Sequence, residues 1–248
     1  FRMLNGGPSR YYEFFLSNGA SFKQLSTNGN LLPSTITTTS VRLGVAERAD
    51  VIVDFTSAVA GTKIYLQNRL EQLDGAGTTG KIIAPTNLVE FRVQSGTVAD
   101  PSIVPATILA LPNKNQAVSV NRQFDFGTSS GAWVVNGEIF DPNTITVFPI
   151  QNAKEKWKLT SGGGWSHPVH LHFEEGQILT RDGNTTLVPD DVGRKDVYRI
   201  GQGSIGESGS GQMETFYQWR DFLGDYPMHC HNVVHEDHAM MIRYEIVP

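Results

Sequence analysis

The chain has 248 residues, of which 39% are hydrophobic and 18% are charged, so it can build a sizeable core and is not disordered in composition. Its formal net charge of −5 disfavours nucleic acid or an anionic membrane as a main partner, because either would favour a basic patch. The sequence has no run of 18 apolar residues, so no membrane-spanning helix is predicted. A single cysteine excludes an internal disulfide framework.

The first 95 residues consist of short strand-like runs separated by Gly, Asn and Asp, with no long helical period. Four segments carry this pattern: residues 1–19 (strand, turn, strand), 41–55, 63–68 and 87–94. Within 41–55 we expect a turn at residues 47–50. The chain begins with FRML, without an initiator Met, a signal peptide or a polar leader, so we expect it to start inside a domain.

Residues 96–116 contain three prolines and are typical of a linker between domains. Strand patterns resume at residue 117 with AVSVNRQFDF, WVVNGEIF, ITVFPI and KEKWKLT, and end with MIRYEIV, where Ile242, Tyr244 and Ile246 share one face. We expect the Gly-rich segment 201–211 to be mobile. The sequence therefore predicts an all-β fold of two antiparallel β-sandwich domains with little helix, residues 1–95 and 117–248.

All seven histidines and the only cysteine lie in two short segments. The first is HPVHLH at residues 167–172, and the second is HCHNVVHEDHAMM at 229–241. The first 166 residues contain no histidine. Because imidazole is the commonest protein metal ligand, this distribution indicates a metal site.

Cys230 has a histidine on either side, and on a strand end those two neighbours point to the face opposite the thiol. This arrangement suits two different metal sites joined by one residue. A His₂Cys set with a weak axial Met is the blue-copper arrangement, and Cys230, His235 and Met240 supply three of those four ligands. His167 can complete that set, while the second site takes the alternating pairs His170 and His172, and His229 and His231.

Zinc is the main competing metal. The HEDH segment at residues 235–238 lacks the HExxH spacing of a zinc-protease helix. Structural zinc sites usually use closed Cys/His quartets and would not need Met240, although a lone methionine is more often a core residue than a ligand.

HPVHLH, followed some 60 residues later by HCHxxxHxxxxM, resembles the two carboxy-terminal copper motifs of multicopper oxidases. WVVNGEIFDPNTI and KWKLTS are similar to the start of the third cupredoxin domain, and residues 1–19 and 43–55 to the second. The segment HCHNVVHEDHAMM is especially similar to bilirubin oxidases, spore-coat laccases and bacterial copper-efflux oxidases. The resemblance covers nearly the whole chain. It implies Greek-key, cupredoxin-like domains that form the carboxy-terminal part of a three-domain enzyme.

The resemblance also implies a role for each ligand. His167, Cys230 and His235 match the type 1 copper ligands, with Met240 axial; His170 matches a type 2 ligand; and His172, His229 and His231 match type 3 ligands. Glu236 matches a proton donor near the trinuclear cluster, and Cys230 would relay electrons. His238 matches no ligand.

The implied reaction couples four one-electron oxidations of a small-molecule or metal-ion donor to the reduction of O₂ to water, with about four coppers in the complete enzyme. The family takes two further HxH motifs from its first domain, so we expect an amino-terminal cupredoxin domain as a partner. The alternative is a non-enzymatic electron-transfer protein with only the type 1 copper. Family members suggest the periplasm, the cell exterior or the spore surface.

Two features depart from the most common motif. Phe173 occupies a position where many members have Gly. For Glu174 and Glu175 we expect either a solvated loop or a role in shaping access to the type 1 site.

Overall fold

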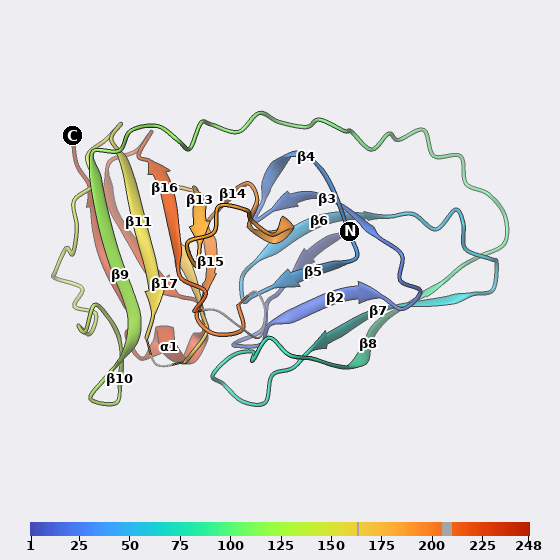
Figure 1. Ribbon diagram of the computed structural model, residues 1–248, viewed down its shortest axis with the longest axis horizontal. Helices are drawn as coiled ribbons and strands as arrows, with labels where there is room; N and C mark the ends of the chain where they lie inside the picture. The colour runs from blue at the N-terminus through green and yellow to red at the C-terminus, as the bar shows by residue number, and fades with distance from the viewer. Residues whose placement is uncertain (163, 205–209) are drawn as a thin grey trace.

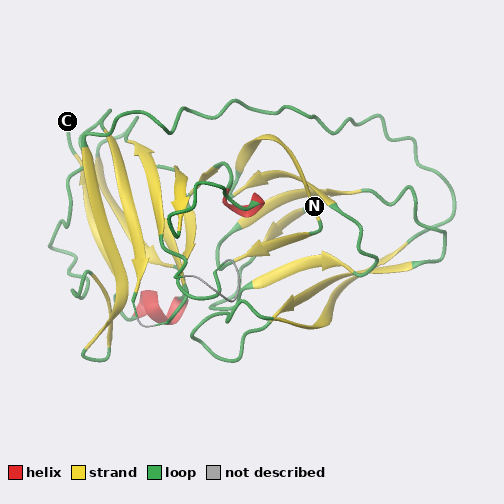
Figure 2. Ribbon diagram, in the orientation of Figure 1, coloured by secondary structure: helices red, strands yellow, loops and turns green. Residues whose placement is uncertain are grey.

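The computed structural model describes residues 1–162, 164–204 and 210–248, and these are almost entirely strands and loops (Figures 1 and 2). The amino-terminal half contains β1 (Arg2–Leu4), β2 (Tyr12–Leu16), β3 (Phe22–Thr27), β4 (Asn30–Thr38), β5 (Ser40–Leu43), β6 (Arg48–Val53), β7 (Lys63–Leu70) and β8 (Ile82–Arg92). The carboxy-terminal half contains β9 (Val120–Ser129), β10 (Ala132–Val135), β11 (Lys154–Ser161), β12 (His167–Leu171), β13 (Gly176–Arg181), the 3-10 helix η1 (Pro189–Asp191), β14 (Arg194–Lys195), β15 (Val197–Ile200), β16 (Met213–Gln218), β17 (Gly224–Cys230), the short helix α1 (Val233–Asp237) and β18 (Met241–Ile246). The predicted all-β fold with little helix is confirmed.

Each half consists of two sheets. The amino-terminal sheets have the orders β1-β6-β3-β4 and β5-β2-β7-β8, and the carboxy-terminal sheets the orders β10-β9-β11-β16-β13-β14 and β15-β12-β17-β18. Among the described strands only β9 and β11 pair in parallel, so the chain must cross over between them. The predicted mobile segment 201–211 includes residues 205–209, which lie outside the described part of the chain.

Alternating side chains build a separate core in each half. In β18, Ile242, Tyr244 and Ile246 are buried and their neighbours only half-buried, as the period-2 pattern predicted. The carboxy-terminal core is centred on Trp157, which is fully buried with ring centroids 4.7 Å from Phe124 and 5.1 Å from Trp219. These sheets therefore pack face to face around an aromatic core.

Two predicted elements differ in the structure. The turn lies at residues 44–47, before β6 rather than inside it, because the Glu47 carboxylate accepts the backbone N–H of Gly44 at 2.7 Å and Ala46 adopts φ +65°. The predicted strand ITVFPI forms only isolated parallel bridges to the β18 region, at Val147 and Ile150. Pro149 between them has no N–H to donate to a regular ladder.

The segment between β8 and β9 runs along the outside of the molecule (Figure 1). Its described contacts with β4 include an isolated bridge between Ser34 and Thr107 and a hydrogen bond from the Ile108 N–H to the Pro33 carbonyl (3.0 Å). The linker at residues 96–116 and the two domain boundaries stay predictions. No helix in the described part of the chain is long and apolar enough to cross a membrane.

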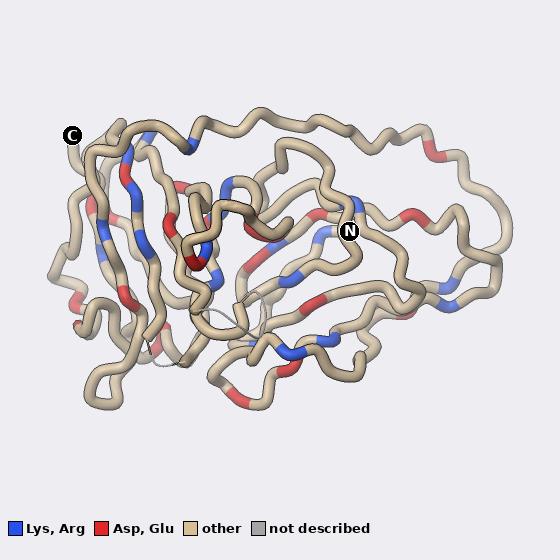
Figure 3. Tube along the Cα trace, in the orientation of Figure 1, with Lys and Arg blue, Asp and Glu red and all other residues tan. Residues whose placement is uncertain are grey.

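Buried ion pairs join the two halves. The Lys195 ammonium lies 2.9 Å from the Glu47 carboxylate and the Arg199 guanidinium 3.0 Å from it, with all three side chains 1% exposed. Elsewhere acidic and basic residues are interspersed along both halves (Figure 3). A charge buried this deeply is tolerated only when paired, so these contacts hold β14 and β15 against the amino-terminal half.

Candidate metal centre

Strand pairing brings the two histidine segments together. β12 lies between β15 and β17, and its register with β17 places Val169 opposite Cys230 and His170 opposite His229. Cys230 is the last residue of β17, as the strand-end argument requires. The residue after α1, His238, is exposed and belongs to neither of the clusters described below.

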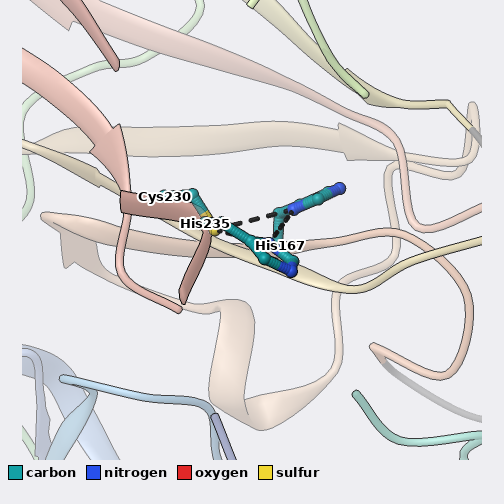
Figure 4. Close-up of side chains that lie close together, drawn as sticks. All are labelled: His167, Cys230 and His235. Atoms are coloured by element: carbon teal, nitrogen blue, oxygen red, sulfur yellow. Dashed lines mark hydrogen bonds between the residues drawn. The ribbon is translucent and has the colours of Figure 1, made fainter. Parts of the chain in front are cut away.

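The first cluster contains His167, Cys230 and His235, all at most 1% exposed (Figure 4). The Cys230 Sγ lies 3.5 Å from the Nδ1 of each histidine, and the two Nδ1 atoms are 3.1 Å apart. A triangle with these sides has a centre about 2 Å from every corner, close to a metal–nitrogen bond of about 2.0–2.1 Å and shorter than a metal–sulfur bond of about 2.3 Å. Two imidazole nitrogens and one thiol sulfur at this spacing could hold one metal ion.

The protonation states of the histidines suit metal binding. Burial, together with the neighbouring His235, lowers the pKa of His167 to about 3, and burial lowers that of His235 to about 4. Both imidazoles are therefore neutral near pH 7, with a lone pair available for a ligand. Burial raises the pKa of the Cys230 thiol, so a bound cation is needed to hold it as thiolate.

The backbone of Met240 forms hydrogen bonds with two residues of this cluster, His235 and Cys230. Its N–H donates to the His235 carbonyl at 3.0 Å, and its own carbonyl accepts from the Cys230 N–H at 3.0 Å. The residue is fully buried in the same core as Cys230, so its backbone joins the two ligand-bearing segments. Its side chain remains a predicted ligand.

Two tryptophans cover His235. The Trp133 ring stacks on the His235 ring with centroids 3.7 Å apart and planes at 23°. Trp165 meets both rings edge-on, at 4.7 Å from Trp133 and 5.5 Å from His235. Both tryptophans are half-buried, so they separate the cluster from solvent.

The second cluster contains His170, His172 and His229, whose ligand atoms lie within 4.8 Å of one another. The Nε2 atoms of His172 and His229 are 3.2 Å apart. His231 lies beside this cluster, with its ring centroid 5.4 Å from that of His170 and 5.1 Å from that of His229. The structure therefore groups the four predicted histidines, three of them tightly.

Other contacts direct the ring nitrogens of this second cluster. The Nδ1 of His170 lies 2.9 Å from the Asp196 carbonyl, which leaves Nε2 free. The Nδ1 of His229 lies 3.3 Å from the Cys230 carbonyl and 3.4 Å from a Glu236 carboxylate oxygen. Burial lowers the pKa of His229 to about 3, with a smaller effect of the neighbouring histidines.

Glu236 lies on α1, which begins after Asn232, whose side chain caps the helix by accepting the Val234 N–H at 3.2 Å. This cap directs the half-buried carboxylate of Glu236 toward His229. Partial burial raises the pKa of Glu236. A carboxyl of this kind can hold a proton beside the second cluster.

Glu174 is not in a solvated loop, because its carboxylate is buried between two arginines. It is 3% exposed, and its carboxylate lies 2.8 Å from both Arg194 and Arg220. Glu175 is half-buried and lies 3.1 Å from Arg194. The expectation of a solvated loop was wrong for Glu174, because Arg194 on β14 and Arg220 after β16 stabilise its burial, whereas a role in shaping access to the type 1 site stays a prediction.

Phe173 adopts φ +69°, in the left-handed region that favours Gly, which is consistent with the expectation of Gly at this position. Its ring stacks on Tyr226 with centroids 4.7 Å apart. The hydroxyl of Tyr244 donates to the carbonyl of His172 at 2.5 Å. Aromatic packing therefore stabilises an unfavourable backbone conformation directly after a cluster histidine.

Sequence reasoning missed four residues that bear on the clusters: Trp133, Trp165, Asp196 and Arg48, whose guanidinium lies 2.8 Å from the Asp196 carboxylate. Trp133 lies in a segment that was identified only as a strand. Asp196 contributes its backbone carbonyl, which any residue type would carry, so no sequence signal could have found it.

A buried Cys–His–His triangle next to a histidine cluster, built from the adjacent strands β12 and β17 and the helix α1, is the arrangement expected of a metal-binding protein with two linked sites. A family profile described as multicopper oxidase matches residues 109–248, which is more than half of the chain. The chain therefore belongs to the multicopper oxidase family, which implies copper.

Known relatives agree with this family. The chain is 31% identical to a bilirubin oxidase of Albifimbria verrucaria over 98% of this chain and 44% of that protein. It is 27% identical to a laccase of Bacillus subtilis over 97% of this chain and 49% of that protein. The fold matches the crystal structure of the multicopper oxidase McoA of Aquifex aeolicus with a TM-score of 0.86 and 23% identity, over 100% of this chain and 55% of that one. The likeness confirms the Greek-key, cupredoxin-like fold, and the chain spans about half the length of the relatives it matches.

Proposed function

We propose that this chain supplies the complete type 1 copper site and half of the trinuclear cluster of a laccase-like multicopper oxidase. The observation that carries the proposal is the position of Cys230. Its thiol belongs to one ligand cluster, and the preceding residue, His229, belongs to the other. One strand end thus joins a site that can collect single electrons to a site that can bind O₂.

At the type 1 site, copper would be held by His167, Cys230 and His235, with Met240 as a further ligand. Bound copper supplies one-electron redox chemistry there. The chain's part is to exclude water, keep both imidazoles neutral and hold the three donor atoms at the spacing described above. Support comes from the burial of all four residues.

At the trinuclear cluster, His170 is the type 2 ligand, and His172, His229 and His231 are type 3 ligands. An amino-terminal cupredoxin domain, in the same precursor or a separate chain, supplies the remaining ligands. The overall reaction consumes one O₂, four protons and four electrons and forms two waters. The donor loses the four electrons one at a time.

Cys230 relays each electron, because it is covalently linked to both His229 and His231 and its carbonyl lies 3.3 Å from the Nδ1 of His229. Glu236 supplies protons to the cluster. Its raised pKa and its distance of 3.4 Å from His229 support this role.

The donor is a small organic molecule or a metal ion that approaches near Trp133 and Trp165, which cover His235. The names of the relatives, bilirubin oxidase and laccase, favour an organic donor. A location in the periplasm, outside the cell or on a spore surface fits such a donor.

The test is Cys230→Ser in the copper-loaded chain, with His238→Gln as the matched surface control. We expect Cys230→Ser to abolish the intense blue absorption while the circular dichroism spectrum stays that of a β-protein. The control keeps both signals. A blue band that survives in Cys230→Ser refutes the type 1 assignment.

The number of coppers bound per protein distinguishes the oxidase from the alternative, an electron-transfer protein with only the type 1 copper. Joined to its amino-terminal domain, the protein should bind about four coppers and reduce O₂, whereas one copper would favour electron transfer. The chain alone should fail to reduce O₂. Turnover by the chain alone would contradict the half-cluster proposal.

A further inference from the structure

One cluster histidine is held through a contact that starts in the other half of the molecule. Arg48, the first residue of β6, reaches Asp196 with both guanidinium nitrogens, at 2.8 Å and 2.9 Å from the two carboxylate oxygens. The backbone carbonyl of the same Asp196 lies 2.9 Å from the Nδ1 of His170. Arg48 belongs to the amino-terminal half and Asp196 to the carboxy-terminal half. His170 lies on β12, which pairs on one side with β15, the strand after Asp196, and on the other side with β17, which ends at Cys230.

The Asp196 carbonyl is a shared acceptor. It also accepts the backbone N–H of Leu171 at 2.9 Å, which fixes its position relative to β12. A carbonyl can only accept, so His170 must carry its proton on Nδ1 to make this bond. The lone pair then lies on Nε2, the nitrogen that remains free to bind a metal.

Arg48 is itself held rigidly. Its guanidinium donates to the carbonyls of Ala46 (3.0 Å) and Asn28 (2.8 Å) in addition to the Asp196 carboxylate. The side chain of Asn28 donates to the carbonyl of Val197 at 3.1 Å, one residue beyond Asp196. Two residues of the amino-terminal half therefore hold the 196–197 segment on both sides of the carbonyl that His170 uses.

We propose that Arg48 is a positioning residue for His170. Its bidentate bond to Asp196 holds the Asp196 carbonyl where it accepts from Nδ1 and so selects the tautomer that presents Nε2 to the second cluster. The identity of His170 as a copper ligand rests on the proposed function, but the tautomer selection does not. A purely structural role for the pair would stabilise the interface and leave the His170 tautomer unchanged.

The matched control is Arg122, which also binds a carboxylate through two nitrogens, at 2.6 Å and 2.9 Å from Glu155. Its side chain is 21% exposed, against 35% for Arg48. Arg122 uses Nε and one terminal nitrogen where Arg48 uses its two terminal nitrogens, but Arg122→Gln likewise removes a two-nitrogen ion pair with a carboxylate, without touching His170.

The experiment is long-range ¹H–¹⁵N correlation of histidine side chains in the metal-free chain at about pH 7.5, with the His170 signals assigned by His170→Gln. In Arg48→Gln we expect the ratio of the Nδ1–H to the Nε2–H tautomer to fall about fivefold, equivalent to about 1 kcal/mol, the typical worth of one hydrogen bond. Arg48→Lys keeps the charge but not the bidentate bond, so it should give an intermediate ratio. Arg122→Gln should leave the ratio unchanged.

Asp196→Asn provides a second variant of nearly the same size, and circular dichroism checks that each variant folds. An unchanged His170 tautomer in the folded variants, Arg48→Gln or Asp196→Asn, overturns the proposal. Since the readout needs no copper, this failure would leave the copper assignment standing. Conversely, a blue band that survives in Cys230→Ser would refute the copper assignment and leave the tautomer result standing.

Discussion

Acidification should destabilise the metal-free chain through its buried histidines. The pKa values of His167 and His229 are about 3 and that of His235 is about 4, against about 6.5 in the unfolded chain. The folded pKa values are lowered, so below pH 6.5 the unfolded state binds more protons. The free energy of unfolding is therefore unaffected above about pH 6.5, falls as the pH drops below it, and levels off near the folded pKa values.

The size of the effect follows from the pH interval. At pH 5 each histidine is about 1.5 units below its unfolded pKa, which costs about 2 kcal/mol at about 1.36 kcal/mol per unit. All three side chains are less than 5% exposed, so solvent screening removes little of this cost. Because all three imidazoles stay neutral in the folded chain at pH 5, their losses sum to about 6 kcal/mol, comparable with the whole stability of many domains, about 5–15 kcal/mol.

The assay is urea unfolding followed by tryptophan fluorescence at about pH 7.5, 6.5, 5.5 and 5.0. His229→Gln should reduce the loss between pH 7.5 and 5.0 by about 2 kcal/mol, because one buried histidine is removed. The remaining loss comes from the other histidines whose pKa values burial lowers, namely His167, His235 and the partly buried His170 and His172. His238→Gln, which alters an exposed histidine, should keep the wild-type loss. A free energy of unfolding that stays constant within about 1 kcal/mol over this range would refute the reasoning.

Three further predictions concern single side chains. Glu236→Gln in the complete enzyme should slow O₂ reduction more than reduction of the type 1 site by donor, measured by stopped flow; equal slowing would argue against a proton role. Trp157→Phe should lower the free energy of unfolding by about 2–3 kcal/mol, because it leaves a cavity and removes the 2.7 Å bond from the indole N–H to Glu155; a loss under about 0.5 kcal/mol in urea unfolding would contradict this. Phe173→Gly should have a free energy of unfolding about 1 kcal/mol higher than that of Phe173→Ala, and so a higher urea midpoint, because only Gly relieves the positive φ. Equal midpoints of the two variants would exclude strain at this position.

The candidate site was largely predictable from local rules. Strand alternation separates Cys230 from its two histidine neighbours, and this needs only that Cys230 lie at a strand end, which β17 confirms. His167 and His170 are three residues apart on β12, so their side chains lie on opposite faces of the strand, and His167 lies with Cys230. The alternation in β18 was equally local, since one face of the strand meets the core.

The remaining features depend on contacts that no local pattern encodes. The burial of Glu174 requires Arg194 on β14 and Arg220 in the loop after β16, which lie 20 and 46 positions further along the chain. Pro149 breaks a run that otherwise has the composition of a strand, and its effect is visible only beside β18. The bond between Arg48 and Asp196 joins residues 148 positions apart.

The amino-terminal half carries no histidine, yet it determines the environment of the metal centre. Glu47 is the partner of both Lys195 and Arg199, and removing one partner of a buried pair costs about 3–5 kcal/mol because the other charge stays buried and unpaired. Lys195 directly precedes Asp196, whose carbonyl His170 needs. The interface that neutralises these charges therefore also contacts the segment that carries the Asp196 carbonyl, so we expect the amino-terminal half to influence the orientation of His170 even though every predicted copper ligand of the chain lies in the other half.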